Sequence, residues 1–188
     1  CRAHLLPSPP LETAEAVACF NYEDKIIKRA IWKLKYSGLS SLAQELAALM
    51  SENLHEDLVE LTTFAGKEKI LVLPIPINKK RERQRGYNQA ALLAKALAKT
   101  LPEILEYRGD ILLKVKNTLP QVAVQSRAAR LTNLRDAFAV NRPETIKKRT
   151  ILIIDDVITT GATLAEARHA LKTSGGETIL AAALTHKE

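Results

Sequence analysis

Cysteine is scarce in this sequence and long hydrophobic runs are missing, and both absences narrow the class of protein. Two cysteines among 188 residues do not make the disulfide scaffold of a small secreted domain, and they suit a reducing cytoplasm. No apolar run approaches the roughly 18–20 residues that cross a bilayer. The opening "CRAHLLPSPP" also lacks the apolar segment of a signal peptide. We therefore expect a cytoplasmic protein without a membrane span.

Acidic residues are outnumbered by basic ones. The chain has 28 Lys and Arg against 21 Asp and Glu, a formal net charge of +7 at pH 7. A basic balance fits an anionic partner, either nucleic acid or a phosphorylated small molecule. A basic surface with no partner would give the same totals, so charge alone leaves these alternatives open.

Strand-like and helix-like segments alternate along the chain. Helices are predicted in residues 22–38, 41–50, 88–101, 126–138 and 163–176, and strands in 69–77, 110–115, 137–140, 149–156 and 177–184. This alternation predicts βαβ units and a mostly parallel sheet. We expect an α/β fold of about five strands flanked by helices, with the N-terminal helices as a hood over the strand ends. Residues 20–188 would form the domain, and residues 1–19, which hold three prolines, an irregular arm.

One stretch carries chemistry that packing does not explain. "ILIIDDVITTGATL" (151–164) leads an apolar run into two adjacent carboxylates and then into small hydroxylated residues around Gly161. Asp155 and Asp156 can accept hydrogen bonds from the neighbouring hydroxyls of a sugar, and Mg²⁺ could share the site. The amides and hydroxyls of residues 159–163, at the start of a helix, suit an anion. Together they predict a site for a ribose with a 5′-phosphate; the alternative is an acidic turn followed by a threonine N-cap.

The same stretch resembles the phosphoribosyl-diphosphate (PRPP) binding signature of type I phosphoribosyltransferases. The resemblance implies that Asp155 and Asp156 hold the ribose hydroxyls and are the catalytic acids. It implies that the following loop holds the 5′-phosphate. The PRPP-binding residues carried over by position are Asp155, Asp156, Val157, Thr159, Thr160, Gly161, Ala162 and Thr163.

Other segments are similar to the ComF-like, competence-associated branch of that family. They are "LPIPINKKRERQRGYNQAALLAKAL", "NTLPQVAVQSRAARLTNLRDAF" and "IIKRAIWKLKYSG". Tyr87 stands where phenylalanine is commoner in the branch. The resemblance runs from about Phe20 to the end of the chain and implies a type I phosphoribosyltransferase-like fold.

The resemblance and the position of the basic stretch suggest two further sets of site residues, one for diphosphate and one for a mobile loop. The basic stretch after the strand at 69–77 suits a diphosphate, with Asn78, Lys79, Arg85, Gly86 and Asn88 as candidates. A solvated charged face or a nucleic-acid contact is the alternative for this stretch. Type I enzymes carry a mobile loop over the site, which here would include Gln121, Arg127, Arg130 and Asn133. Surface arginines of a helix are the alternative for that set.

The resemblance implies PRPP as substrate with Mg²⁺, and transfer of the phosphoribosyl group to an acceptor that the signature does not identify. The competing hypothesis is a non-catalytic module that senses PRPP or a nucleotide and works with single-stranded DNA or competence proteins. The family often carries an N-terminal zinc ribbon, of which Cys1 would be a remnant. Zinc is not expected in this chain, because Cys1, His4 and Cys19 give three ligands where a structural zinc takes four. The sequence does not indicate an oligomeric state.

Overall fold

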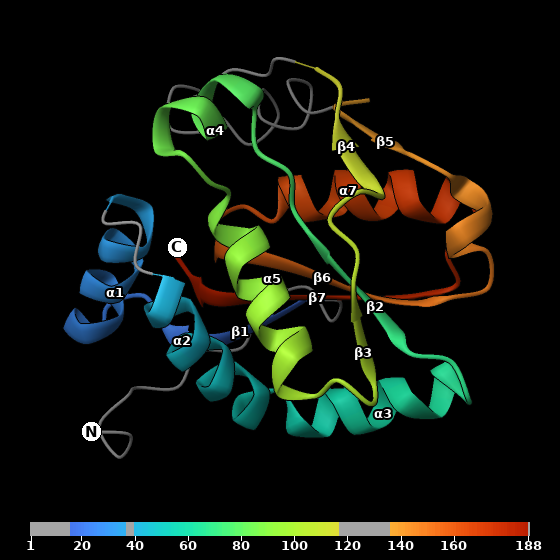
Figure 1. The fold of residues 1–188 in the computed structure, drawn as a ribbon, viewed down its shortest axis with the longest axis horizontal. Coiled ribbons are helices and arrows are strands. Elements are labelled where there is room, and N and C mark those ends of the chain that lie inside the picture. The colour runs from blue at the N-terminus through green and yellow to red at the C-terminus, as the bar shows by residue number, and fades with distance from the viewer. Residues whose placement is uncertain (1–15, 37–39, 117–135, 188) are drawn as a thin grey trace.

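The centre of the fold is a sheet of five parallel strands. The computed structural model describes residues 16–36, 40–116 and 136–187. The strands lie in the order β1-β7-β6-β2-β3, and every pair of neighbours is parallel (Figure 1). Their bounds are β1 (Ala16–Asn21), β2 (Ile70–Pro74), β3 (Leu105–Tyr107), β6 (Thr150–Ile158) and β7 (Thr178–His186). The predicted α/β class and five-stranded parallel sheet are confirmed.

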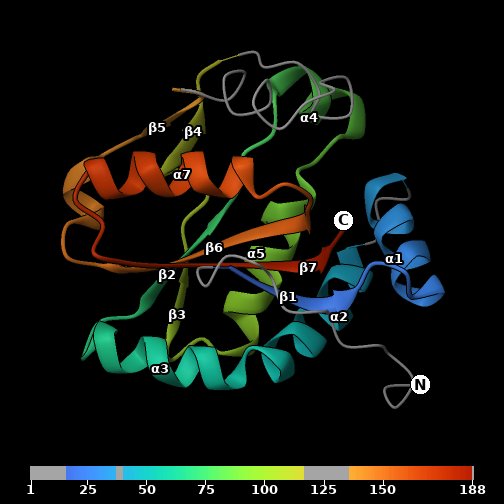
Figure 2. The same cartoon turned by 180° about the vertical axis from the view of Figure 1, so that it is seen from behind.

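Helices cover both faces of this sheet. One face carries α2 (Ser40–Asn53), α3 (His55–Ala65) and α5 (Gln89–Thr100). The opposite face carries α7 (Ala162–Thr173), a short 3₁₀ helix (Pro143–Ile146) and a separate antiparallel pair, β4 (Leu112–Lys114) with β5 (Phe138–Val140) (Figure 2). Helix α1 (Lys25–Tyr36) lies near the carboxyl ends of the strands, beside the C-terminus (Figure 1). Of the N-terminal helices, α1 is therefore the one at the strand ends.

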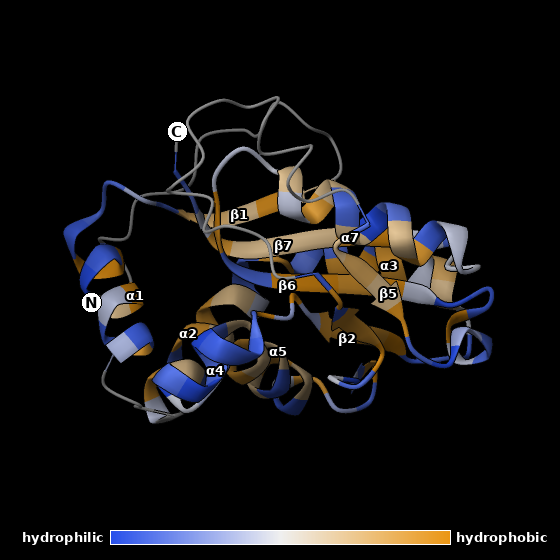
Figure 3. Ribbon diagram, turned by 90° about the horizontal axis from the view of Figure 1, so that it is seen from above, coloured by the Kyte–Doolittle hydropathy of each residue, from blue (hydrophilic) through white to orange (hydrophobic). Residues whose placement is uncertain are grey.

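Alternate residues of the central strands belong to two separate hydrophobic cores. In β6, Leu152 and Ile154 face the core under α5, whereas Ile151 and Ile153 face the core under α7. Because both faces are covered, the strand is apolar throughout this segment, as its unbroken "ILII" predicts. Figure 3 shows these strands in the orange of hydrophobic residues between the helical layers.

The structure corrects two sequence-based expectations. Strand β1 begins at Ala16 and pairs with β7, so residues 16–19 belong to the sheet and not to an irregular arm. The basic stretch after β2, for which we expect a loop from its lack of apolar residues, is instead the helix α4 (Lys79–Arg85), capped by Asn78 and ended by Gly86 in the left-handed conformation. None of its residues is buried, so the hydrophobic period that reveals a helix is missing. Helix α3 and strand β3 were not predicted either.

Candidate functional site

The two acids of the PRPP-like signature lie within the last part of β6. Strand β6 continues to Ile158, past the point where β2 leaves the sheet: the last β2 residue paired with it is Pro74, opposite Ile154. On the other side β7 stays paired, with Ala183 opposite Asp155. The acids therefore project from the carboxyl edge where one neighbouring strand has ended. Parallel sheets bind ligands at this edge.

The two carboxylates meet different partners, as their adjacent positions on a strand predict. Asp156 Oδ2 lies 2.9 Å from Lys35 Nζ, at the end of α1, and Asp156 Oδ1 accepts a hydrogen bond from the Val157 amide at 3.0 Å. Asp155 Oδ1 accepts one from the Asp156 amide at 2.8 Å. The side chains of Lys35 and Asp156 are only 25% and 17% exposed, so this ion pair is better shielded than a surface pair.

Charge is concentrated around Asp155. Burial raises the pKa of its carboxyl well above the ordinary value, and the negative charge of Asp156 raises it further, while Lys35 acts in the opposite direction. Burial also lowers the pKa of Lys114 on β4; the positive charge of Arg81 adds to the lowering and Asp155 opposes it. An acid and a base that both resist ionisation thus lie within electrostatic reach of each other. A bound ligand that supplies the missing partners would stabilise both charged forms.

The loop after β6 has the backbone that an anion cradle needs. Gly161 is the N-cap of α7 with φ +71°, a left-handed conformation that favours glycine. A Cβ built at Gly161 would meet no atom within 4 Å, so the space in front of this turn is open. Within the described part of the chain, Thr160 Oγ1 is buried without a hydrogen-bond partner. The Ala162 side chain is buried in the α7 core, which leaves its backbone as the group that faces a ligand.

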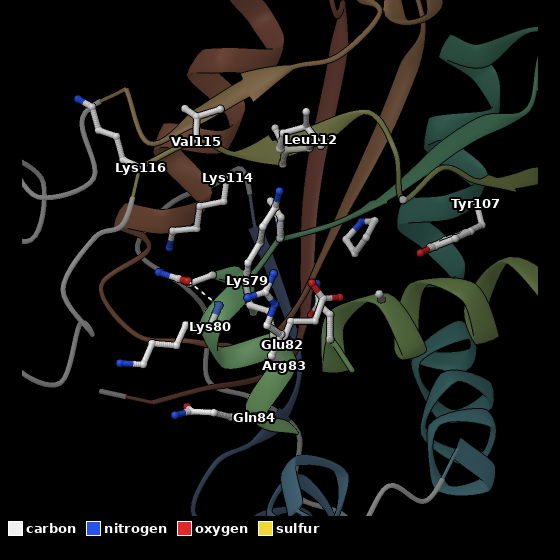
Figure 4. A pocket seen from close by; sticks show the side chains of 18 residues that line it. Lys79, Lys80, Glu82, Arg83, Gln84, Tyr107, Leu112, Lys114, Val115 and Lys116 are labelled. Carbon is white, nitrogen blue, oxygen red and sulfur yellow. Dashed lines mark hydrogen bonds between the residues drawn. The ribbon is translucent and has the colours of Figure 1, made fainter. Parts of the chain in front are cut away.

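A large cavity lies beside the end of β2. It measures about 1300 Å³ and is lined by β2, α4, the start of α5, and β4 (Figure 4). Lys79, Lys80 and Arg83 of α4 line it on one side, and Lys114 of β4 and Lys116 just after β4 line it on the other. Figure 4 also shows Glu82 among these cations. The cavity suits a strongly anionic ligand group.

The five residues predicted to bind diphosphate do not face one cavity. Asn78, Lys79 and Asn88 line the large one, whereas Arg85 lines a second, smaller cavity on the other side of α4. The Asn88 side chain is buried and caps α5: its Oδ1 accepts from the Ala90 amide at 3.0 Å and its Nδ2 donates to the Ile75 carbonyl at 2.9 Å. These bonds favour a role for Asn88 in holding the loop before α4 against α5.

The remaining predicted residues lie partly near the Gly161 turn and partly outside the described residues. Val157 is partly buried against the core that α1 and α5 share. Thr159 and Thr163 flank Gly161 as the signature requires, and His186 Nε2 lies 3.2 Å from the Thr159 carbonyl oxygen. The four residues assigned to the mobile loop, Gln121, Arg127, Arg130 and Asn133, lie outside the described residues.

Sequence reasoning missed two residues at this site, Lys35 and Lys114, and it left the role of Arg81 open among the cations of the basic stretch. The segment that ends in Lys35 was quoted for its resemblance, but nothing in its spacing points to Asp156 as partner. Lys114 lines the large cavity from β4, whereas Arg81 lines the smaller cavity from α4, and these two elements are far apart in the chain. A charged side chain in a predicted strand, as Lys114 is, was the one available signal.

The site offers oxygen ligands but no preassembled metal centre. Over residues 16–36, 40–116 and 136–187, no group of three or more His, Cys, Asp and Glu is arranged to hold a metal ion. Cys19 is buried and free, and burial raises the pKa of its thiol to about 12. None of the helices in the described ranges is long and apolar enough to cross a membrane.

This chain is similar to a family of phosphoribosyl transferase domains and to proteins named for DNA utilization and for competence. The family described as "Phosphoribosyl transferase domain" matches residues 88–188. "DNA utilization protein YhgH" of Escherichia coli is 28% identical over 179 residues, which are 95% of this chain and 74% of that protein. "Competence protein F" of Haemophilus influenzae is 37% identical over 57% of this chain and 46% of its own length. "Competence protein ComFC" of Bacillus subtilis is 27% identical over 83% of this chain and 57% of its own length. The chain thus spans about half of each competence protein.

Solved structures with a similar arrangement include a Trypanosoma cruzi hypoxanthine phosphoribosyl transferase. It is 15% identical with a TM-score of 0.40, over 95% of this chain and 73% of that one. An allosteric regulatory enzyme of purine biosynthesis is also 15% identical, with a TM-score of 0.41, over 76% of this chain and 25% of that one.

Proposed function

Because this chain belongs to the phosphoribosyl transferase domain family, in its ComF-like branch, we propose that it binds PRPP and transfers the phosphoribosyl group to an acceptor. The observation that carries the proposal is the pair Asp155 and Asp156 at the open edge of β6, directly before the Gly161 turn. The carboxylates would accept hydrogen bonds from the ribose hydroxyls. The loop of residues 159–163 would bind the 5′-phosphate through backbone amides and threonine hydroxyls.

The diphosphate would lie in the large cavity. Lys79 and Lys114 line it from two elements, and Asn78 fixes the start of α4 by accepting a hydrogen bond from the Lys80 amide at 2.9 Å. The lowered pKa of Lys114 supports this position, because an anionic ligand would favour its charged form. Arg85 and Gly86 do not line this cavity, so our proposal gives them no contact with the diphosphate.

The transfer breaks the bond between ribose C1 and the diphosphate oxygen, and the electron pair leaves with the diphosphate. A lone pair of the acceptor forms the new bond to C1, and any proton on the attacking atom goes to solvent. Positive charge that develops on the ribose ring would lie near Asp155 and Asp156, while Lys79 and Lys114 would stabilise the leaving diphosphate. The chemistry needs no nucleophilic side chain.

The donor set fits Mg²⁺, which prefers oxygen ligands and usually takes one or two carboxylates together with substrate phosphates. Asp155 would hold it from the protein side, because Asp156 Oδ2 is already paired with the Lys35 cation. When bound, Mg²⁺ supplies positive charge that neutralises the diphosphate. The raised pKa of Asp155 supports this role, because a nearby cation would favour the ionised carboxylate.

The names of the relatives suggest where such an activity would be used. Relatives named for competence and for DNA utilization support a role in the handling of DNA that enters the cell, with single-stranded DNA or competence proteins as partners. A module that binds PRPP without turnover, and reports nucleotide supply to such partners, is the alternative function. The exposed cations of α4 favour keeping DNA among the ligands to be tested.

Calorimetry of PRPP with Mg²⁺, followed by a diphosphate-release assay with a panel of bases and amines, tests the proposal. We expect PRPP to bind more tightly than ribose 5-phosphate, because the latter lacks the diphosphate. Release above the spontaneous rate with one acceptor would identify an enzyme. PRPP binding without release for any acceptor would favour the sensing module, and failure to bind PRPP would refute both.

A further inference from the structure

A second cavity lies between α1 and α4, next to the ribose acids. It measures about 370 Å³ and is lined by Lys35 and Tyr36 from the end of α1 and by Arg81, Gln84 and Arg85 from α4. Figure 1 shows the two helices on the same side of the molecule, near the C-terminus. Lys35 connects this cavity to the signature, because its Nζ contacts Asp156 Oδ2 at 2.9 Å. A molecule in the cavity would therefore lie beside the proposed ribose position.

The cavity has more positive charge than its own neighbours neutralise. Lys35 is paired with Asp156, but no carboxylate of the described residues forms an ion pair with Arg81 or Arg85. The Arg85 Nη1 group donates to the Gln89 Oε1 atom at 3.0 Å, and its guanidinium lies over the Tyr36 ring with 5.8 Å to the centroid. Both of these partners are neutral. An anionic ligand would supply the carboxylate or phosphate oxygens that guanidinium groups bind in pairs.

An aromatic surface lies at the same place. The Tyr36 side chain is 63% exposed, and the Trp32 side chain is 59% exposed with its ring centroid 5.5 Å from that of Tyr36. A contiguous exposed aromatic surface, unlike a single exposed side chain, can mark an interaction site. A planar ring can stack on such aromatic side chains, while the guanidinium that lies over the Tyr36 ring binds a negative substituent.

The wall of this cavity is held in place. The Tyr87 hydroxyl, just after α4, donates a hydrogen bond of 2.8 Å to the Leu34 carbonyl of α1. Tyr87 thus joins the two helices that form the cavity, next to the residues that line it. A preformed cavity loses less freedom when a ligand binds.

We propose that this cavity binds the acceptor of the phosphoribosyl group, and that the acceptor is a planar, aromatic molecule with a negatively charged substituent. The inference rests on the proposed function, because PRPP places ribose C1 beside Asp156 and thus beside Lys35. Arg85 and Arg81 bind the negative group, Tyr36 stacks on the ring, and Lys35 orients the acceptor toward the ribose. A cavity of this size fits a small molecule, at the low end of the roughly 300–1,000 Å³ typical of ligand sites.

The test compares two ring compounds of the same shape and different charge, pyridine-3-carboxylate and pyridine-3-carboxamide. Trp32, the single tryptophan of the chain, reports binding by its fluorescence. We expect the carboxylate to bind the wild-type protein about tenfold more tightly, as the loss of a charge-assisted hydrogen bond implies. Arg85→Gln should abolish this preference. Arg83→Gln, on the same helix but lining the large cavity, should retain it.

Equal binding of the two compounds to wild-type protein, or equal effects of the two arginine variants, would overturn the inference. A single-stranded oligothymidylate whose binding depends on Arg85, with no preference between the pyridines, would overturn it in favour of nucleic acid. PRPP with Mg²⁺ is titrated calorimetrically into the same proteins to separate the two proposals. A carboxylate preference in a protein that does not bind PRPP would refute the proposed function and with it the acceptor assignment, and would show only an anion-binding cavity.

Discussion

Replacing Asp155 by asparagine should weaken PRPP binding and at the same time stabilise the protein at neutral pH. The substitution keeps the shape of the side chain and removes its charge. If the Asp155 carboxylate accepts a hydrogen bond from a ribose hydroxyl, its loss costs about 1.5–3 kcal/mol of binding free energy. That range corresponds to roughly a 10- to 150-fold rise in the Kd for PRPP. Calorimetry with Mg²⁺ present measures it.

The effect on stability follows from the direction of the pKa shift. Burial and the negative charge of Asp156 raise the folded-state pKa of Asp155 above that of the unfolded chain. The wild-type protein therefore loses stability as the pH rises from about 4, the ordinary value for an aspartate, through the raised pKa. Asp155→Asn removes this loss. Its thermal midpoint should match the wild type in acid and exceed it at pH 8.

Asp110 gives a control with the opposite sign. Hydrogen bonds from the Arg108 guanidinium lower the pKa of the Asp110 carboxyl, so its contribution to stability is present at neutral pH and is lost as the pH falls. Asp110→Asn should lower the midpoint slightly at pH 8, because the side chain is 48% exposed, and should leave PRPP binding unchanged. Unchanged PRPP affinity in Asp155→Asn would refute the ribose assignment. A midpoint that falls at pH 8 in that variant would refute the electrostatic reasoning.

Two further substitutions test the loop and the ion pair. Gly161→Val should abolish binding of PRPP and of ribose 5-phosphate but keep a cooperative unfolding transition, since a Cβ there strains the backbone without meeting another atom. Gly66→Val, with a similar positive φ outside the site, is the control and should bind normally. Equal binding by both variants would exclude the phosphate cradle. Lys35→Met should move the pH dependence of PRPP binding to higher pH, because Lys35 lowers the pKa of Asp155; Lys33→Met on the same helix is the control, and identical pH profiles for the two variants would exclude the coupling.

The central strands and the longer helices could be predicted because burial leaves a strong pattern in them. Strand β6 is apolar on both faces, and the buried Ile27, Ile31 and Leu34 recur on one face of α1. Helix α4 could not be found in this way, because it buries nothing. Its signals are the caps alone, Asn78 before it and Gly86 after it. Strand β3 has three residues, too few for any period.

The donor half of the candidate site could be read from one continuous stretch, because Asp155, Asp156 and the Gly161 turn are neighbours in sequence. The cationic part of the site could not be predicted, since its geometry depends on how α1 and α4, which are distant in sequence, pack beside the acids. From the sequence, Lys79 and Arg85 were both candidates for the same diphosphate, because they belong to one basic stretch. In the structure the helix turns them toward different cavities, and the pairing of Lys35 with Asp156 depends on where α1 packs.

The two hydrophobic cores on opposite sides of the sheet have an evolutionary consequence. The buried residues at the start of α7, after the Gly161 turn, belong to one core, whereas the buried face of α1 belongs to the other. Substitutions that reshape the rim of α1 around Trp32 and Tyr36 therefore leave the packing beneath the phosphate loop intact. Under the proposed function, the exposed aromatic rim of α1 could change with the acceptor while the core beneath the Gly161 turn stays as it is.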